Sequence, residues 1–275
     1  MIDPIRVAIQ GERGAYSEQA AVALYGAEAV IIPCRTLQDV FLALSHKEAD
    51  AAAVPIENSR AGTIVETYDL LLSHSFAVTG EYLLRVRHCL LGLPGTSLDE
   101  IRHAYSHPQA LAQCRGFLER YAIAPENAYD TAGSAQSLMR LGDRTAAAIA
   151  SRRAAELFGL AILAEGIEDR QDNVTRFLAV GSPPHIPAAG GRSLLAFTVP
   201  NEPGALVRCL GPFARHDCNL SKLESRPGQD EAFTYVFYLD VDRRADDPAC
   251  ARALEELAAV ATSCRLLGSF GSSDA

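Results

Sequence analysis

The stretch VAIQGERGAYSEQAA, residues 7–21, opens with a short apolar run, continues through a loop of small and polar residues, and ends in a helical pattern. The same succession follows four more times, beginning at the apolar runs 50–56, 103–105, 128–130 and 146–150. Five units in which a strand, a polar loop and a helix alternate predict an α/β architecture with mostly parallel strands.

The loops of these units hold serine, threonine and asparagine where each helix is expected to begin. Taken singly, each such residue is explained by helix capping. Ligands of open α/β sheets bind beyond the carboxyl ends of the strands, where helix N-termini offer unpaired N–H groups and the positive end of the helix dipole. Five such loops together therefore favour a site for a small anion, such as a carboxylate or a phosphate.

Two long strand-like runs, EYLLRVRHCLLGL at 81–93 and VTRFLAV at 174–180, stand apart from this repeat. Two extended crossings between groups of elements are typical of a hinge that joins two lobes with a cleft between them. We therefore expect a two-lobed domain over residues 1–180, with hinges near 78–92 and 168–180.

The segment GSPPHIPAAGGR at 181–192 holds three prolines and three glycines and is interpreted as a linker. Beyond it, the apolar patterns alternate in the order strand, helix, strand, strand, helix, strand over residues 193–270. This βαββαβ order is that of a ferredoxin-like domain. The last residues, 271–275, are expected to form a tail.

Composition excludes several classes of protein. A formal net charge of −9 argues against nucleic acid as a partner, because phosphates need a basic face. Seven cysteines stand singly without a CxxC pair, which is typical of reduced thiols in the cytoplasm rather than of disulfides or a zinc site. No apolar run approaches the ~18 residues of a membrane span, and the first residues lack a signal-peptide core.

Motifs for nucleotide binding, metal binding and hydrolase nucleophiles are missing, because GERGAYSE has only two glycines and neither HExxH nor GxSxG occurs. No hydroxyl is paired by motif with a base, so we expect a reaction that needs positioning and one weak acid. Hydroxyl, amide and charged side chains in the loops suit this task. These candidates are Ser17, Glu57, Asn58, Ser59, Thr63, Ser106, Gln109, Gln113, Ser134, Asn173, Thr175 and Arg176.

Six stretches occur in one order along the chain: GERGAYSEQAA, PIENSRAGTIVETYDLL, HCLL, YSHPQALAQC, TAGSA and EDRQDNVTRFLAV. Together they resemble the catalytic domain of the prephenate dehydratase family, with PIENS and TRF as the most specific signals. SLLAFTVPNEPGALVRCL and LSKLESRP resemble the ACT regulatory domain of the same family. The resemblance covers roughly residues 5–270 and implies a two-lobed, periplasmic-binding-protein-like catalytic domain followed by an ACT domain.

The resemblance implies a lyase that converts prephenate to phenylpyruvate in L-phenylalanine biosynthesis, with loss of carbon dioxide and water. Aromatisation drives the reaction, so the family needs no metal, nucleotide or covalent cofactor. Thr175 matches the family's favoured proton donor, and Arg176 is expected to clamp a carboxylate. Asn58, Ser106, Gln113 and Glu57 are the other expected catalytic residues. The expected substrate-binding residues are Gly14, Ser17, Ser59, Gln109, Ser134 and Asn173.

Two of these residues have a simpler explanation as well. Arg176 suits an ion pair with Glu168 or Asp169. Glu57 suits a structural acceptor, because a carboxylate that faces a dianion repels it unless it is protonated or turned away. Gly14 is interpreted as a turn glycine that lets the backbone approach the ligand.

GALVRCL and LESRP match the stretches that form the phenylalanine site of this family's ACT domains, usually across an interface between two regulatory domains. We therefore expect phenylalanine to inhibit turnover, and the chain to form a homodimer or homotetramer. Leu206 and Leu210 share one helical face and suit either the phenyl ring or the core. The expected effector site comprises Asn201, Gly204, Ala205, Leu206, Leu210, Glu224, Ser225 and Arg226.

Three other functions stay open. An arogenate dehydratase performs the same ring chemistry on an aminated side chain. A solute-binding protein also closes two lobes on an anion, without chemistry. An amino-acid-sensing regulator with a degenerate first domain is the third.

Overall fold

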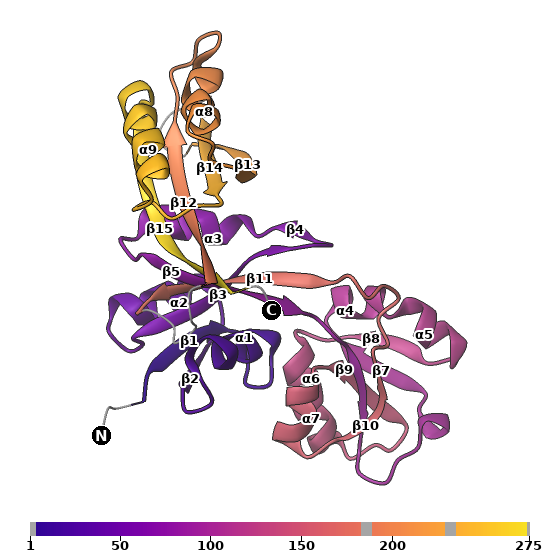
Figure 1. Cartoon of the computed structure of the whole chain (residues 1–275). Coiled ribbons are helices and arrows are strands. Elements are labelled where there is room, and N and C mark those ends of the chain that lie inside the picture. Colours follow the sequence, from indigo (N-terminus) through magenta and orange to yellow (C-terminus); the bar gives the residue numbers. More distant parts are fainter. Residues whose placement is uncertain (1–3, 183–188, 229–234, 274–275) are drawn as a thin grey trace. The chain divides into compact units, whose positions relative to one another are not determined.

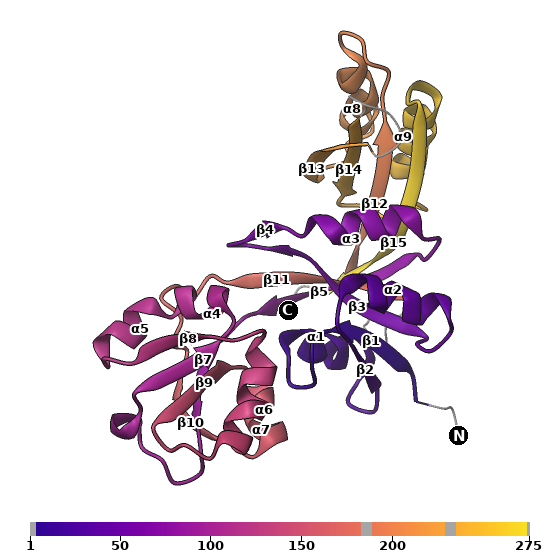
Figure 2. The same cartoon turned by 180° about the vertical axis from the view of Figure 1, so that it is seen from behind.

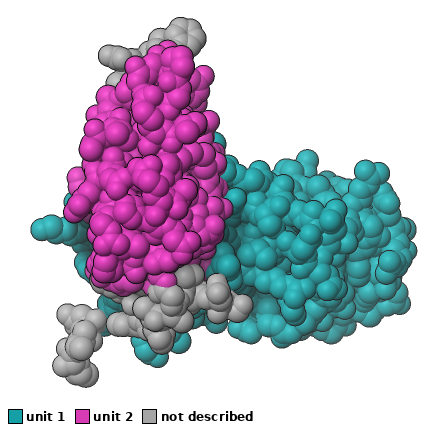
Figure 3. Space-filling model, turned by 45° about the horizontal axis from the view of Figure 1, so that its top comes forward, with its two compact units in different colours: residues 1–67, 83–177 teal, residues 68–82, 178–275 magenta. Residues whose placement is uncertain are grey.

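The computed structural model describes residues 4–182, 189–228 and 235–273. One compact unit comprises residues 1–67 and 83–177, and the other 68–82 and 178–275 (Figure 3). Part of the expected linker, 183–188, and the end of the expected tail, 274–275, lie outside the described residues. The domain boundaries expected from sequence stay a prediction.

The first unit contains two α/β lobes, and its first lobe is built on β1 (Arg6–Gln10) (Figure 1). This strand pairs in parallel with β2 (Val30–Cys34) on one side and with β3 (Ala51–Asn58) on the other. Val7, Ala8 and Ile9 are fully buried, as is typical of a central parallel strand that is covered on both faces.

Further elements complete this lobe. Helices α1 (Tyr16–Tyr25) and α2 (Leu37–Ser45) pack against its sheet. The short strand β4 (Gly62–Thr63) pairs antiparallel with β3, and β11 (Val174–Gly181) is the next strand beyond β3. Helix α3 (Val65–Ser73), strand β5 (Val78–Arg85) and β11 each begin in one unit and end in the other.

The second lobe contains a five-stranded sheet in the order β10-β6-β9-β7-β8, visible from behind in Figure 2. Strand β7 is parallel to β8 and β9, whereas β6 is antiparallel to β9 and β10. The strands are β6 (Cys89–Gly92), β7 (His103–Ser106), β8 (Ala124–Asn127), β9 (Ala146–Ala150) and β10 (Ala161–Glu165). The helices are the 3-10 helix η1 (Leu98–Glu100), α4 (Pro108–Gln113), α5 (Arg115–Arg120), α6 (Thr131–Leu141) and α7 (Arg152–Phe158).

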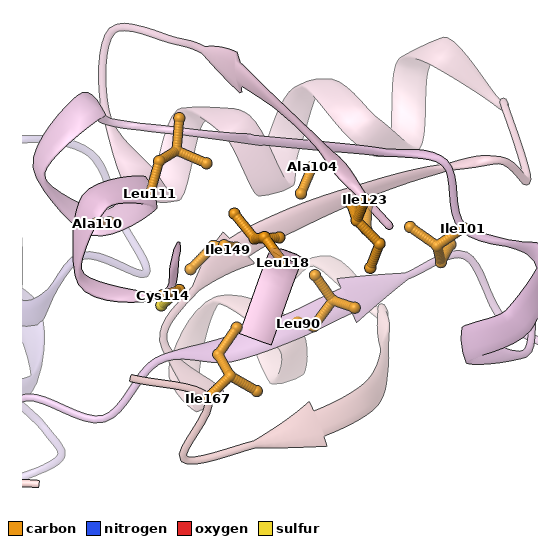
Figure 4. Packing of buried hydrophobic residues seen from close by; sticks show 11 residues of the cluster. Leu90, Ile101, Ala104, Ala110, Leu111, Cys114, Leu118, Ile123, Ile149 and Ile167 are labelled. Atoms are coloured by element: carbon orange, nitrogen blue, oxygen red, sulfur yellow. The ribbon is translucent and has the colours of Figure 1, made fainter. Parts of the chain in front are cut away.

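Successive side chains of β9 pack against helices on opposite faces of the sheet. Ile149 lies in one buried cluster with Leu111 of α4 and Leu118 of α5 (Figure 4). Its neighbour Ala148 lies in a second cluster with Leu138 of α6. Because successive side chains of a strand point to opposite faces, α4 and α5 cover one face of the sheet and α6 covers the other.

The second unit contains the expected βαββαβ succession. Its strands lie in the order β13-β14-β12-β15, with antiparallel neighbours. Helices α8 and α9 share a buried core with β12 and β14 that includes Leu195, Phe213 and Leu257. The predicted fold class, two α/β lobes followed by a ferredoxin-like domain, is therefore confirmed. The elements are β12 (Ala189–Thr198), α8 (Ala205–Arg215), β13 (Leu220–Pro227), β14 (Tyr235–Val241), α9 (Pro248–Val260) and β15 (Ser263–Ser273).

The described helices are short, and α9, with 13 residues, is the longest of them. None has both the length and the apolar character needed to cross a membrane.

Candidate functional site

A cavity of about 220 Å³ in the first unit collects several of the expected site residues. It lies at the end of β3 and the start of β11, and receives further residues from α1, α4 and the connection between β5 and β6. Among the expected residues, those that line it are Asn58, Gln109, Gln113, Asn173 and Thr175. The other lining residues are Tyr16, Val86, His88, His107, Ala110, Asp130 and Thr131.

Asn58 is the centre of the polar contacts at this cavity. Its Oδ1 accepts hydrogen bonds from the backbone N–H groups of Arg60 and Ala61, both at 2.9 Å. Its Nδ2 donates to Asn173 Oδ1 and to Thr175 Oγ1, both at 2.8 Å. The side chain is buried, and both its Oδ1 and its Nδ2 make two hydrogen bonds. One amide therefore holds the turn after β3 and the start of β11 together.

The contacts continue from Asn173 to the second lobe. Asn173 Nδ2 donates to Gln113 Oε1 at 2.9 Å, and the same oxygen lies 2.8 Å from His88 Nε2. His88 Nδ1 lies 2.8 Å from the hydroxyl of Tyr16, which also lies within hydrogen-bonding distance of the Arg87 carbonyl, at 2.9 Å. We call the series Tyr16, His88, Gln113, Asn173, Asn58 and Thr175 the polar relay.

Burial keeps the relay uncharged at neutral pH. It lowers the pKa of His88, although the hydrogen bond with Gln113 and the negative charge of Glu168 act in the opposite direction. It also raises the pKa of Tyr16 well above its usual value. The imidazole and the phenol are therefore both neutral, and they act as hydrogen-bonding groups rather than as charges.

Asp130 and His107 reach the cavity because each caps a helix. The carboxylate of Asp130, which is half-buried, accepts a hydrogen bond from the Gly133 N–H at the start of α6. His107 Nδ1 accepts from the Gln109 N–H at the start of α4, at 3.2 Å. Asp130 also lines a larger neighbouring cavity of about 700 Å³, which it shares with Ser134 of α6.

Ser106 and Ser134 lie outside the set that lines the 220 Å³ cavity. Both are buried and donate to backbone carbonyls at 2.6 Å, Ser106 to Ile149 and Ser134 to Asp130. In this structure these hydroxyls tie a strand end and a helix start to their surroundings, and their substrate roles stay predictions.

Glu57 and Arg176 each stand next to a cavity residue on a strand. Because side chains alternate along a strand, they point away from the face that presents Asn58 and Thr175. Glu57 is half-buried and Arg176 is buried, and neither lines the 220 Å³ cavity. Their expected catalytic roles stay predictions.

Gly14, Ser17 and Ser59 flank the site. Gly14 has a φ of +89°, and a Cβ added to it would lie 3.1 Å from the Cα of Ala154 in α7. Packing against α7 therefore leaves no room for a side chain at residue 14, a reason for glycine that the sequence did not reveal. Ser17 is half-buried in α1. Ser59 Oγ donates to the Asp172 carbonyl at 2.8 Å, close to the start of β11.

The expected effector residues lie in the second unit. Gly204 is the N-cap of α8 with a φ of 78°, and Ala205 follows it as a buried residue. Leu206 and Leu210 pack against the core shared by α8 and α9, which agrees with the simpler explanation of these leucines. Asn201 is exposed, and Glu224, Ser225 and Arg226 lie on β13.

Seven of the residues that line the cavity were not selected from the sequence, and Tyr16, His88 and Asp130 are three of them. Tyr16 and His88 do lie in two of the quoted motifs, GERGAYSEQAA and HCLL, and Asp130 directly precedes TAGSA. The motifs could have drawn attention to them. Their convergence could not be found from spacing, because Tyr16 and His88 are 72 residues apart.

Comparison with known proteins identifies related chains. Residues 7–185 match the prephenate dehydratase family and residues 193–259 match the ACT domain. Arogenate dehydratase/prephenate dehydratase 2, chloroplastic, from Arabidopsis thaliana is 42% identical over 278 residues, which cover 97% of this chain and 72% of that relative.

Two solved structures share the fold over almost the whole chain. The prephenate dehydratase of Arthrobacter aurescens, in complex with L-Phe, has a TM-score of 0.86 at 33% identity and covers 97% of this chain and 90% of its own. GqqA, described as a novel type of quorum quenching acylase, has a TM-score of 0.89 at 35% identity and covers 98% of both chains.

Proposed function

The chain belongs to the prephenate dehydratase family, and on that premise we propose that it converts prephenate to phenylpyruvate in L-phenylalanine biosynthesis. The reaction releases the ring carboxylate as carbon dioxide and the ring hydroxyl as water, and takes up one proton. Because aromatisation drives these losses, the protein needs only to orient the substrate and to supply that proton.

The position and the hydrogen bond of the Thr175 hydroxyl support this proposal. Its Oγ1 accepts the hydrogen bond from Asn58 Nδ2, so the hydroxyl has its single proton to donate to an oxygen in the cavity. A threonine is a weak acid. The hydrogen bond from Thr175 to the departing oxygen therefore acts by strengthening as negative charge develops on that oxygen, rather than by full proton transfer beforehand.

Product formation tests the proposal directly. We expect the purified chain to form phenylpyruvate from prephenate, followed by the absorbance of phenylpyruvate in alkali and proportional to enzyme concentration. A solute-binding protein or a degenerate enzyme would bind prephenate without producing phenylpyruvate above the buffer control, and that result would reject the enzymatic proposal.

Asp130 favours arogenate as a second substrate. Its half-buried carboxylate lines the cavity, and the residues that line this cavity include no lysine or arginine. A carboxylate attracts the ammonium group of arogenate's side chain and repels the keto acid of prephenate. The relative from Arabidopsis thaliana is named for both activities, which agrees with a site that accepts either substrate.

Replacing Asp130 by asparagine tests this preference. We expect kcat/KM for arogenate to fall by roughly 3–10-fold, and kcat/KM for prephenate to stay constant or rise, because a half-exposed ion pair contributes about 1 kcal/mol. Asparagine caps a helix as well as aspartate does, so the melting temperature should be unchanged. An equal decrease in kcat/KM for both substrates would show that Asp130 caps α6 and does not discriminate between the substrates.

We also propose that the second unit binds L-phenylalanine as a feedback inhibitor. The Nε of Arg226 is buried without a hydrogen-bond partner among the residues that the structure describes, and such a donor suits the carboxylate of an amino acid. The ACT match and the L-Phe complex of the Arthrobacter aurescens protein support this role. The assembly is proposed to be a homodimer or homotetramer, because the family's effector site usually lies between two ACT domains.

Inhibition by phenylalanine is then expected in the intact protein. Millimolar L-phenylalanine should lower the initial rate several-fold by favouring a less active state, as a coupling of about 1–3 kcal/mol implies. Replacing Arg226 by glutamine should weaken this inhibition without changing the rate in its absence. Rates that are equal with and without L-phenylalanine would contradict the regulatory proposal.

The expected location is the cytoplasm. The seven cysteines are all free thiols in the structure, and five of them are buried. Reduced thiols of this kind support a reducing compartment.

A further inference from the structure

The polar relay has a direction that the backbone imposes. Two backbone N–H groups, of Arg60 and Ala61, point at one side-chain atom of Asn58. A backbone N–H can only donate, so that atom must be the carbonyl oxygen Oδ1. The other atom of the amide is therefore Nδ2, and it must donate to both Asn173 and Thr175.

This orientation passes along the relay. Because Asn173 accepts through Oδ1, its Nδ2 faces Gln113 and donates to Gln113 Oε1. Gln113 Oε1 therefore accepts, and it also faces His88 Nε2 at 2.8 Å. Two acceptors cannot share a hydrogen bond, so His88 Nε2 must carry a proton.

Since His88 is neutral, it has one ring proton, and its other nitrogen is a bare acceptor. That nitrogen, Nδ1, lies 2.8 Å from the Tyr16 hydroxyl, and the Arg87 carbonyl lies 2.9 Å from the same hydroxyl. Because the phenol has one proton, a bare Nδ1 requires that this proton goes to the ring rather than to the carbonyl. The opposite tautomer would set the lone pair of Nε2 against Gln113 Oε1. Removing this repulsion would require the side-chain amides of Gln113 and then Asn173 to rotate by half a turn. The Nδ2 of Asn173 would then face the Nδ2 of Asn58, whose orientation is fixed, and two donors would oppose each other.

We propose that His88 is held as the Nε2–H tautomer, and that Tyr16 and His88 are positioning residues that fix the amides of Gln113 and Asn173. The catalytic part of this inference rests on the proposed function. With Oε1 of Gln113 occupied twice, its NH₂ group is left for a ligand of the cavity that Gln113 lines. With Oγ1 of Thr175 occupied by Asn58, the hydroxyl proton is left for the same ligand. The relay thus presents two donors to an anionic substrate.

Nitrogen NMR of the full-length protein tests the tautomer without any substrate. We would label histidine with ¹⁵N, record ¹H–¹⁵N correlations of the ring at neutral pH, and assign His88 by its absence in His88→Gln. The expected result is a protonated Nε2 with an unprotonated, hydrogen-bonded Nδ1, and no averaging between tautomers. Tyr16→Phe should shift Nδ1 toward the value of a nitrogen without a donor. A protonated Nδ1, or an averaged ring, would overturn the inference.

Kinetics test the positioning role. Glutamine can place an N–H close to the position of His88 Nε2, whereas asparagine is too short to do so. We expect His88→Asn to lower kcat by roughly tenfold or more, His88→Gln to retain most of it, and KM to change less than kcat. Equal kcat values for the two variants, at equal melting temperatures, would overturn the positioning role.

Turnover and the tautomer of His88 are measured independently of each other. A protein that turns over neither prephenate nor arogenate, but shows the expected tautomer, contradicts the proposed function and leaves the tautomer assigned. An active protein with a protonated Nδ1 contradicts the tautomer alone.

Discussion

Replacement of Thr175 by alanine is expected to lower kcat by about 10²–10⁴, the range for loss of a positioned proton donor. The hydroxyl lies in the cavity with its oxygen fixed by Asn58 at 2.8 Å, so the variant loses the donor and leaves one amide proton of Asn58 without its partner. KM should change little, because the hydrogen bond to the departing oxygen strengthens in the transition state rather than in the bound ground state.

Thr175→Ser and Thr175→Val serve as matched controls. Serine keeps the hydroxyl and should retain most of the rate. Valine keeps the shape of the side chain but loses the hydroxyl, so it should be as slow as alanine. Steady-state rates and melting temperatures of all three variants would be compared. A valine variant within threefold of the natural protein would show that Thr175 shapes the strand and donates no proton.

The fold could be predicted further from sequence than the site. Repeated strand–loop–helix units and the βαββαβ order depend on local patterns, and both appear in the structure. Alternation along strands is equally local. It could have separated Thr175 from Arg176, and Asn58 from Glu57, since neighbouring positions face opposite sides.

Other features of the site depend on contacts between distant residues. Ser106 lies in a family motif, yet its hydroxyl donates to the carbonyl of Ile149, which is 43 residues away. Gly14 is needed because α7 packs against it, and no pattern around residue 14 shows this contact. Burial also decides the charge of His88, and burial depends on the whole tertiary structure. Spacing within the sequence contains none of this information.

Asn58 shows how one residue can set the direction of a whole network. Its orientation is fixed by two N–H groups of its own turn, at 2.9 Å each, and this local constraint determines which atoms donate at Asn173, Gln113 and His88. Changing the chemistry of this one side chain, without changing its shape, should therefore affect both catalysis and the distant imidazole.

Replacement of Asn58 by aspartate is expected to lower kcat by about 10²–10³, the loss seen when an oriented donor is removed from an active site. The introduced carboxylate still accepts from the turn, but its second oxygen faces the acceptor Asn173 Oδ1 and the Thr175 hydroxyl, which both lie 2.8 Å from Asn58 Nδ2. Thr175 must then donate its proton to residue 58 instead of to the substrate, and the carboxylate also repels the anion.

The same substitution should reverse the relay. Asn173 and Gln113 would turn their amides over, His88 would move its proton to Nδ1, and Tyr16 would donate to the Arg87 carbonyl at 2.9 Å instead of to the ring. Every bond of the relay is then remade in the opposite sense, so the fold should survive while catalysis does not. Rates, melting temperature and the ¹⁵N shifts of His88 would be measured together. A variant within tenfold of the natural kcat, with the ring proton still on Nε2, would show that Asn58 does not direct the network.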